Sequence, residues 1–167
     1  MGFLSQGEMA MATKACPIKK KKRLRILADQ LWSLAVKVDW GNKCAVCGHV
    51  GKLHSHHLIP RQHTATRYDL RNGVALCRPC HIFNPHTSPH QNAAGWLQWF
   101  ADHHEMACAW YEDSVEIGLY KQTDVVKNPQ YYYDIISDLR QYVEPEDFTR
   151  IVGVRFERWL DLDDDIE

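Results

Sequence analysis

The sequence contains no run of roughly 18 apolar residues, the length that an α-helix needs to cross a bilayer. Its start lacks the apolar core of a secretory signal, and Gln6 stands where a myristoylation motif requires Ser or Thr. We therefore expect a protein of the cytoplasm with no membrane partner. In such a reducing compartment, paired cysteines are more often metal ligands than disulfides.

The sequence also has almost no net charge, because the formal total is −1 at pH 7. That total hides an uneven distribution. Residues 1–100 contain fourteen Lys and Arg against four Asp and Glu, whereas residues 101–167 contain six against seventeen. The split predicts that the basic part meets a polyanion and that the acidic part does not. The alternative is an ordinary solvated surface whose charges cluster by chance.

The chain shows no internal repeat, and the spacing of its apolar residues indicates helices toward both ends. The first pattern covers residues 24–38 and stops at Gly41-Asn42, which predicts the end of a helix there. Residues 1–18 have no periodicity, so we interpret them as a flexible tail. Three further helical patterns cover residues 96–100, 132–143 and 148–160.

Short segments with frequent turn residues occupy the middle of the chain. The pattern predicts a strand over residues 52–59 and a second strand over residues 73–76, after a turn that ends at Asn72. A helix should begin at Cys80 and end early at Asn84-Pro85, since a proline disfavours helical geometry in the residue before it. Two short strands and a short helix are thus predicted in this order.

Four cysteines form two closely spaced pairs, Cys44-x₂-Cys47 and Cys77-x₂-Cys80. A Cys-x₂-Cys turn presents two thiolates to one ion, and two such turns supply the four tetrahedral ligands of a structural Zn²⁺. A thioredoxin-like dithiol is the main rival for either pair. It does not account for two pairs that both lack a surrounding βαβ pattern. The spacing therefore predicts a structural zinc site.

Histidines are concentrated in the same region, with six of the ten between His49 and His81. The adjacent pair His56-His57 lies in a predicted strand, where neighbouring side chains point to opposite faces. One imidazole can then bind a metal ion while the other contacts a water molecule on the opposite face of the strand. His81 directly follows the second cysteine pair, so a bound zinc would anchor its backbone near that strand.

These residues resemble the HNH endonucleases, also called ββα-metal nucleases, over roughly residues 22–105. The motifs that carry the resemblance are His56-His57-Leu58-Ile59-Pro60 and Asn72-Gly73-Val74-Ala75-Leu76-Cys77-Arg78-Pro79-Cys80-His81. The resemblance implies an α+β fold with a ββα-metal core stapled by the four-cysteine zinc site, flanked by an N-terminal helix and a C-terminal helical region. We expect the nuclease domain, with its N-terminal helix, over residues 19–105 and an acidic helical region over residues 106–167.

Within the family, the sequence is similar to zinc-containing nucleases of phage recombination and packaging modules. In those proteins an Arg follows the His-rich strand, and an Ala-Thr-Arg-Tyr/Trp-Asp segment comes next. The corresponding residues here are Arg61 and residues 65–69. The similarity implies a phage or mobile-element protein in a bacterial host cell. Its acidic C-terminal helices would then dock a recombination or packaging protein.

The resemblance implies that His57 is the general base. It implies that Asn72 holds in place the loop beside that base. His56 and His81 become ligands of the catalytic metal ion, Mg²⁺ or Mn²⁺. The family more often has Asp at the position of His56, and an imidazole suits Mn²⁺, Ni²⁺, Co²⁺ or Zn²⁺ better than Mg²⁺. His54 and His63 are reserve candidates for a ligand or the base.

The implied reaction is hydrolysis of DNA phosphodiester bonds, which leaves 5′-phosphate and 3′-hydroxyl ends. His57, with an ordinary pKa of about 6.5, would take a proton from the attacking water. The expected contacts to the DNA backbone are Arg61, Arg67, Lys20, Lys21, Lys22 and Arg23. The alternative is a non-catalytic, zinc-containing module that binds DNA or docks a partner.

Overall fold

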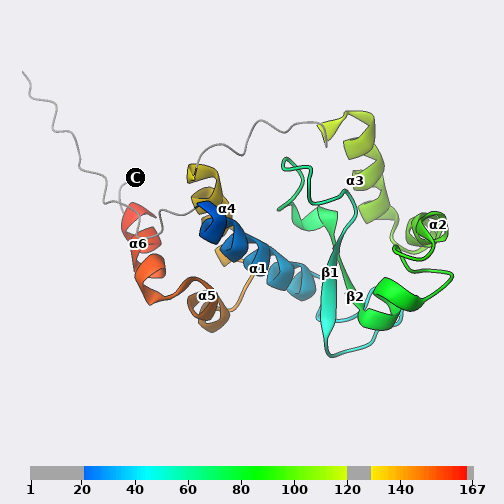
Figure 1. Cartoon of the computed structure of the whole chain (residues 1–167), viewed down its shortest axis with the longest axis horizontal. Coiled ribbons are helices and arrows are strands. Elements are labelled where there is room, and N and C mark those ends of the chain that lie inside the picture. Colours follow the sequence, from blue (N-terminus) through cyan, green and yellow to red (C-terminus); the bar gives the residue numbers. More distant parts are fainter. Residues whose placement is uncertain (1–20, 120–128, 165–167) are drawn as a thin grey trace, which may run out of the picture.

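The computed structural model describes residues 21–119 and 129–164, so the predicted tail and Lys20 lie outside the described residues. In chain order the elements are α1 (Lys21–Asp39), β1 (Leu53–His57), η1 (Leu70–Asn72), β2 (Gly73–Cys77), η2 (Pro79–Phe83), α2 (Ala93–His103), α3 (Glu105–Glu116), α4 (Gln130–Arg140), α5 (Pro145–Val152) and α6 (Val154–Asp164). Figure 1 shows the two-stranded sheet between α1 and α4 on one side and α2 and α3 on the other. The fold is α+β, as the sequence predicts.

Helix α1 forms because its apolar residues recur on one face, and that face is buried from Leu24 to Val36. The helix ends where the sequence predicts. Gly41 and Asn42 follow it with φ angles of 61° and 55°, in the left-handed region that glycine and asparagine tolerate best. The buried residues are Leu24, Leu27, Ala28, Leu31, Trp32, Ala35 and Val36.

Strands β1 and β2 pair antiparallel, with Leu53 opposite Cys77 and His57 opposite Gly73. Both predicted strands are confirmed: β1 is shorter than predicted by one residue at its start and two at its end, and β2 is longer by one residue at its end. Helix α1 packs closely on this hairpin, since a Cβ atom added at Gly73 would lie 2.3 Å from Cγ2 of Val36. The predicted short helix is also confirmed as η2, one π-helical turn that ends at Phe83 before Asn84-Pro85.

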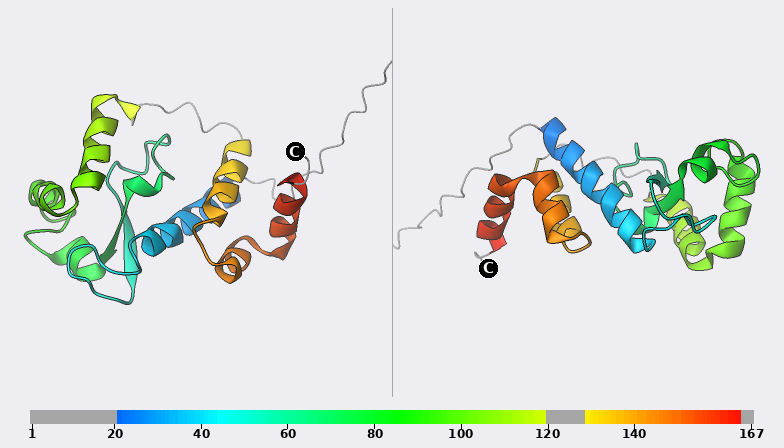
Figure 2. Two further views of the ribbon diagram at one scale, coloured as in Figure 1. Left: turned by 180° about the vertical axis from the view of Figure 1, so that it is seen from behind. Right: turned by 90° about the horizontal axis from the view of Figure 1, so that it is seen from below.

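The described residues form two hydrophobic cores, and the second of them includes residues of the hairpin. The first joins α1 to α4, α5 and α6, with Phe148 and Phe156 among its buried residues. The second joins the cysteine turns and β2 to α2 through Trp96 and Phe100. Because α1 contacts both strands as well as α4 and α5, it links the hairpin to the C-terminal helices (Figure 2).

The helices differ from the sequence expectations in three details. The single helix predicted over residues 148–160 is divided into α5 and α6 by Gly153, whose φ of 84° interrupts helical geometry. Helix α3 lies in the region expected to be helical but was not predicted as a separate element, because it has no continuous apolar stripe and leaves Met106 87% exposed. Leu97, which falls within the predicted apolar pattern at residues 96–100, is 38% exposed. Among the described residues, no helix combines the length and apolar character needed to span a bilayer.

Candidate metal centres and active site

The first cysteine pair lies in a tight turn directly after α1. The backbone amide of Cys44 donates to the carbonyl of His49 at 3.0 Å, and the amide of Gly48 donates to the carbonyl of Cys44 at 2.8 Å. Gly48 has a φ of 69°, which its lack of a side chain permits. The amide of Ala45 also donates to the carbonyl of Ala75 at 2.9 Å, so the turn is attached to β2.

The second cysteine pair faces the first. The sulfur atoms of Cys44, Cys47, Cys77 and Cys80 all lie within 4.8 Å of one another, and Sγ of Cys47 is 3.6 Å from Sγ of Cys77. Burial raises the pKa of the Cys77 and Cys80 thiols, so a neighbouring cation is needed to hold them as thiolates. Four thiols in this arrangement could hold a metal ion such as zinc.

Three histidines form a second cluster beside the hairpin. His56 comes from β1, His81 from η2, and His90 from the segment that follows η2. Nε2 of His81 lies 3.2 Å from Nδ1 of His56 and 3.2 Å from Nε2 of His90. Burial lowers the pKa of His56 to about 3 and that of His81 to about 4, so both rings are neutral at pH 7. Neutral imidazole is the form that binds a metal ion.

The structure thus brings together His56 and His81, the two ligands expected from the sequence, and adds His90. The buried Ser88 places His90 beside His81. The Ser88 hydroxyl donates to the carbonyl of His81 at 2.8 Å and accepts from the backbone amide of His90 at 3.2 Å. Sequence reasoning missed His90 because the nine-residue interval after His81 matches no ligand spacing rule. The only available signal was the local density of histidines.

His54, a reserve candidate in the sequence, contacts the other side of the His81 ring. The two Nδ1 atoms lie 3.0 Å apart, so one of the rings donates to the other. A hydrogen bond at Nδ1 favours the orientation in which Nε2 of His81 faces His56 and His90. His63 is not in the cluster; its Nε2 lies 3.4 Å from Nε2 of the Gln62 side chain.

His57 is held on the opposite side of β1 from His56. Its ring stacks on the indole of Trp32, with centroids 3.8 Å apart and an interplanar angle of 14°. Nε2 lies 3.0 Å from the carbonyl oxygen of Arg67. A carbonyl only accepts, so Nε2 carries the hydrogen and Nδ1 has the free lone pair in the neutral ring. Burial lowers the pKa of His57 to about 4, which makes the neutral ring the main form at pH 7.

Asn72 is fully buried and crosses the base of the loop between β1 and β2. Its Oδ1 accepts from the amide of Ile59 at 2.6 Å, and its Nδ2 donates to the carbonyls of Ile59 and Thr66 at 3.0 and 2.9 Å. The amide of Leu58 donates to the Asn72 carbonyl at 3.0 Å. These bonds close the loop into one unit, which fixes the backbone just before Arg67.

The basic residues expected to contact DNA differ from one another in burial and in their partners. The side chain of Arg67 is only 13% exposed, because its guanidinium group is bound to Asp29 of α1 and to the carbonyl of Arg61. Lys22 and Arg23 are exposed in the first turn of α1, and Lys21 beside them is partly buried. Arg61 is also exposed.

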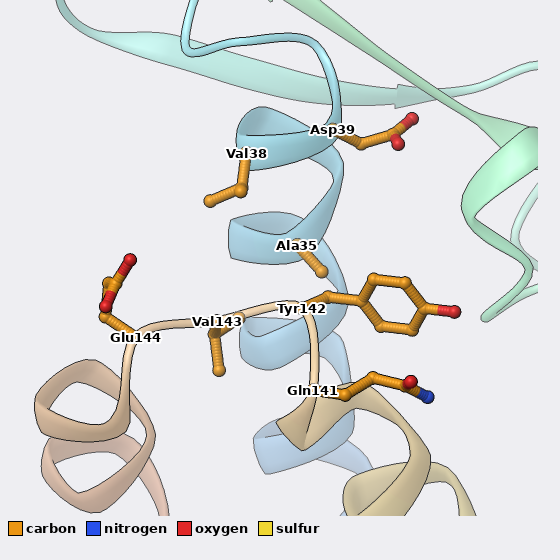
Figure 3. A pocket seen from close by; sticks show the side chains of 7 residues that line it. All are labelled: Ala35, Val38, Asp39, Gln141, Tyr142, Val143 and Glu144. Atoms are coloured by element: carbon orange, nitrogen blue, oxygen red, sulfur yellow. The ribbon is translucent and has the colours of Figure 1, made fainter.

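A hollow elsewhere on the molecule lies between α1 and the connection from α4 to α5 (Figure 3). Among the residues that line it there is no histidine or cysteine, and its two charged groups are the carboxylates of Asp39 and Glu144. Such a lining repels a phosphate. Its residues are Ala35, Val38, Asp39, Gln141, Tyr142, Val143 and Glu144.

No curated protein and no solved structure matches the chain. Residues 44–83 do match the family model of the HNH endonuclease. This span includes the four paired cysteines, the two strands and η2, but neither α1 nor His90. Between Cys44 and Phe83, therefore, the chain is similar to the HNH endonucleases, a family of metal-dependent nucleases that act on DNA.

Proposed function

We propose that this protein is a DNA endonuclease that hydrolyses phosphodiester bonds with His57 as general base and one divalent cation at His56, His81 and His90. The single observation that carries the proposal is the arrangement at the end of β1. His57, a neutral imidazole with a free Nδ1, directly follows His56, which belongs to the cluster of three histidines. Neighbouring residues of one strand thereby supply a base and a candidate metal ligand, the two kinds of group that can hydrolyse a phosphodiester.

In this mechanism His57 takes a proton from water through Nδ1, while the Arg67 carbonyl holds the hydrogen on Nε2 and fixes the tautomer. The ring becomes an imidazolium whose Nε2 hydrogen bond is retained. Asn72 keeps the loop of Arg67 in place. When bound, the cation would offset negative charge on a phosphate oxygen and on the leaving 3′-oxygen. The water oxygen bonds to phosphorus as the bond from phosphorus to the 3′-oxygen breaks, and the 3′-oxygen takes a proton from solvent, so the products are a 5′-phosphate and a 3′-hydroxyl.

The donor set supports a metal preference. All three candidate ligands are imidazoles, which suit Mn²⁺, Co²⁺, Ni²⁺ and Zn²⁺ better than Mg²⁺. We therefore expect activity with Mn²⁺ to exceed that with Mg²⁺. The four thiols would hold a separate, structural Zn²⁺, which keeps the cysteine turn beside η2 and so keeps His81 beside β1.

The DNA contacts proposed are Lys21, Lys22 and Arg23 in the first turn of α1, together with Arg61 after β1. Cations at these positions, exposed except for the partly buried Lys21, can contact phosphates without reading sequence. A phage or mobile-element role in a bacterial host is also part of the proposal. It is supported by Arg61 and the Ala-Thr-Arg-Tyr-Asp segment at residues 65–69. A recombination or packaging partner would bind the acidic residues of the C-terminal helices.

A non-catalytic zinc module that binds DNA is the competing function. It accounts for the four thiols and the basic first half, but it gives no reason for three imidazoles within 4.8 Å of one another. Incubation of zinc-loaded protein with supercoiled plasmid, with and without Mn²⁺, separates the two. Nicking that requires Mn²⁺ and is lost in His81→Ala but kept in His86→Ala supports the nuclease. DNA binding without nicking under any divalent cation supports the module.

A further inference from the structure

We propose that Asp29 of α1 is a positioning residue for His57, acting through Arg67. Asp29 lies outside the span that matches the HNH model, and no motif in the sequence indicates it. The inference rests on the proposed function only in naming His57 as the base.

Asp29 and Arg67 form a two-pronged ion pair. Oδ1 of Asp29 accepts from Nε and Nη2 of Arg67 at 2.9 and 2.7 Å, and Oδ2 accepts from Nη2 at 2.8 Å. The hydroxyl of Tyr68 donates to Oδ1 at 3.0 Å. Burial raises the pKa of Tyr68 well above its usual range, so this phenol stays protonated and remains a donor. Paired contacts of this kind fix the direction of a guanidinium group as well as its position.

Arg67 connects that ion pair to the base. Its side chain reaches α1, while its backbone carbonyl accepts from Nε2 of His57. Nη1 also donates to the carbonyl of Arg61 at 2.6 Å, which closes a ring across the loop. With the side chain held at Asp29 and the loop held by Asn72, the Arg67 carbonyl has little freedom to turn away from His57. The orientation and tautomer of the base thus depend on a carboxylate that does not contact it.

Helix α1 holds the same imidazole in a second way. Trp32 lies three residues after Asp29, so the two side chains project from neighbouring turns of one face. The indole covers one side of the His57 ring. Its Nε1 donates to the carbonyl of Asp69 at 3.1 Å, so the indole itself is fixed to the loop. Asp29 and Trp32 thus attach α1 to the loop on either side of Tyr68, at Arg67 and at Asp69. Helix α1 therefore supports the base.

A purely structural role for Asp29 is the alternative, in which the ion pair only attaches the loop to α1. That role predicts lost stability with an unchanged His57 tautomer in the protein that remains folded. A positioning role predicts a change at His57 itself. The ring nitrogens of His57 report this directly, because a neutral ring fixed as the Nε2–H tautomer has ¹⁵N shifts distinct from those of a mixture.

The experiment compares full-length, zinc-loaded wild-type protein with Asp29→Asn, Arg67→Lys and the control Asp39→Asn. Asp39 is an exposed carboxylate at the other end of the same helix. We measure kcat and KM for plasmid nicking with Mn²⁺, the ¹⁵N shifts of His57, zinc content and the thermal midpoint. Asp29→Asn and Arg67→Lys should lower kcat by about tenfold or more, with KM within about twofold of wild type. Both should show mixed His57 tautomers at full zinc content, and Asp39→Asn should match wild type.

The inference is overturned if Asp29→Asn retains the wild-type kcat and His57 shifts. It is also overturned if kcat falls only in proportion to lost zinc or folded protein. If the wild-type protein nicks no DNA, the proposed function fails, but the His57 shifts still decide the inference. A tautomer that depends on Asp29 then supports it, and an unchanged tautomer rejects it.

Discussion

Nδ1 of His54 lies 3.0 Å from Nδ1 of His81, and the other nitrogen of His81 faces His56 and His90. His54 therefore supports a candidate ligand without being one of the three clustered rings. We predict that His54→Ala weakens Mn²⁺ binding by about tenfold, the usual loss when the partner behind a ligand is removed. Isothermal titration of zinc-loaded protein measures the Kd. An unchanged Kd would show that His81 needs no support from His54.

His90 provides the test of the metal cluster itself. We predict that His90→Ala raises the Kd for Mn²⁺ by about tenfold or more, because one of three neutral nitrogen donors is lost. His86→Ala is the matched control, since His86 lies in the same loop with an exposed side chain. Co²⁺ absorption spectra would report the loss of a nitrogen ligand. Equal affinities in the two variants would remove His90 from the site.

The cysteine cluster should be structural. We predict that Cys77→Ser abolishes binding of the thiolate-held ion and, with it, the ordered packing of the cysteine turn on β2. Cys108→Ser replaces another buried cysteine that is not among the four clustered thiols, so it should keep the ion. Zinc content by mass spectrometry and near-ultraviolet circular dichroism measure both effects. A fully folded Cys77→Ser protein without zinc would contradict the structural role.

Gly73 tests the contact between α1 and the hairpin. A Cβ atom there would meet Val36 at 2.3 Å, so we predict that Gly73→Ala lowers the free energy of unfolding by about 1–3 kcal/mol. Urea denaturation measures the loss. Adding Val36→Ala to this variant should recover part of the stability, although that change leaves a gap of its own. A Gly73→Ala protein as stable as wild type would show that α1 can shift away.

The C-terminal helices should be required for folding. Removing residues 129–167 would expose the face of α1 that packs against α4 and α5, including Leu24 and Leu31. Each fully buried leucine contributes about 1.5–3 kcal/mol. The hydroxyl of Tyr131, which donates to the carbonyl of Thr64 at 3.0 Å, would be lost as well. We predict that the truncated chain is insoluble or shows no cooperative unfolding transition. A cooperative transition in that chain would mean that the first core does not need these helices.

Much of the fold was predictable because its signals are local. The end of α1 follows from Gly41-Asn42, and the positions of both strands follow from short segments and turns. The cysteine cluster was predictable because two Cys-x₂-Cys turns carry their geometry in their spacing. In contrast, the apolar pattern after Pro145 continues across Gly153, and only the backbone angle there reveals two helices.

The parts of the site that could not be predicted depend on contacts between distant residues. Asp29 meets Arg67 from 38 positions away, and an isolated carboxylate in a helix carries no signal of such a partner. Arg67 has a cationic side chain next to a nuclease motif, which favoured a phosphate contact in the sequence. In the structure that side chain is paired with Asp29. His90 required the turn at Ser88 to bring it back to His81.

The most direct measurement is the single-turnover rate of DNA nicking by His57→Ala, at saturating Mn²⁺ and with metal content verified for both sites. The account predicts that this variant binds zinc, Mn²⁺ and DNA as the wild type does but nicks DNA at least about a hundredfold more slowly, because general-base catalysis contributes that much. A rate equal to that of the wild type would contradict the assignment of His57 as the base.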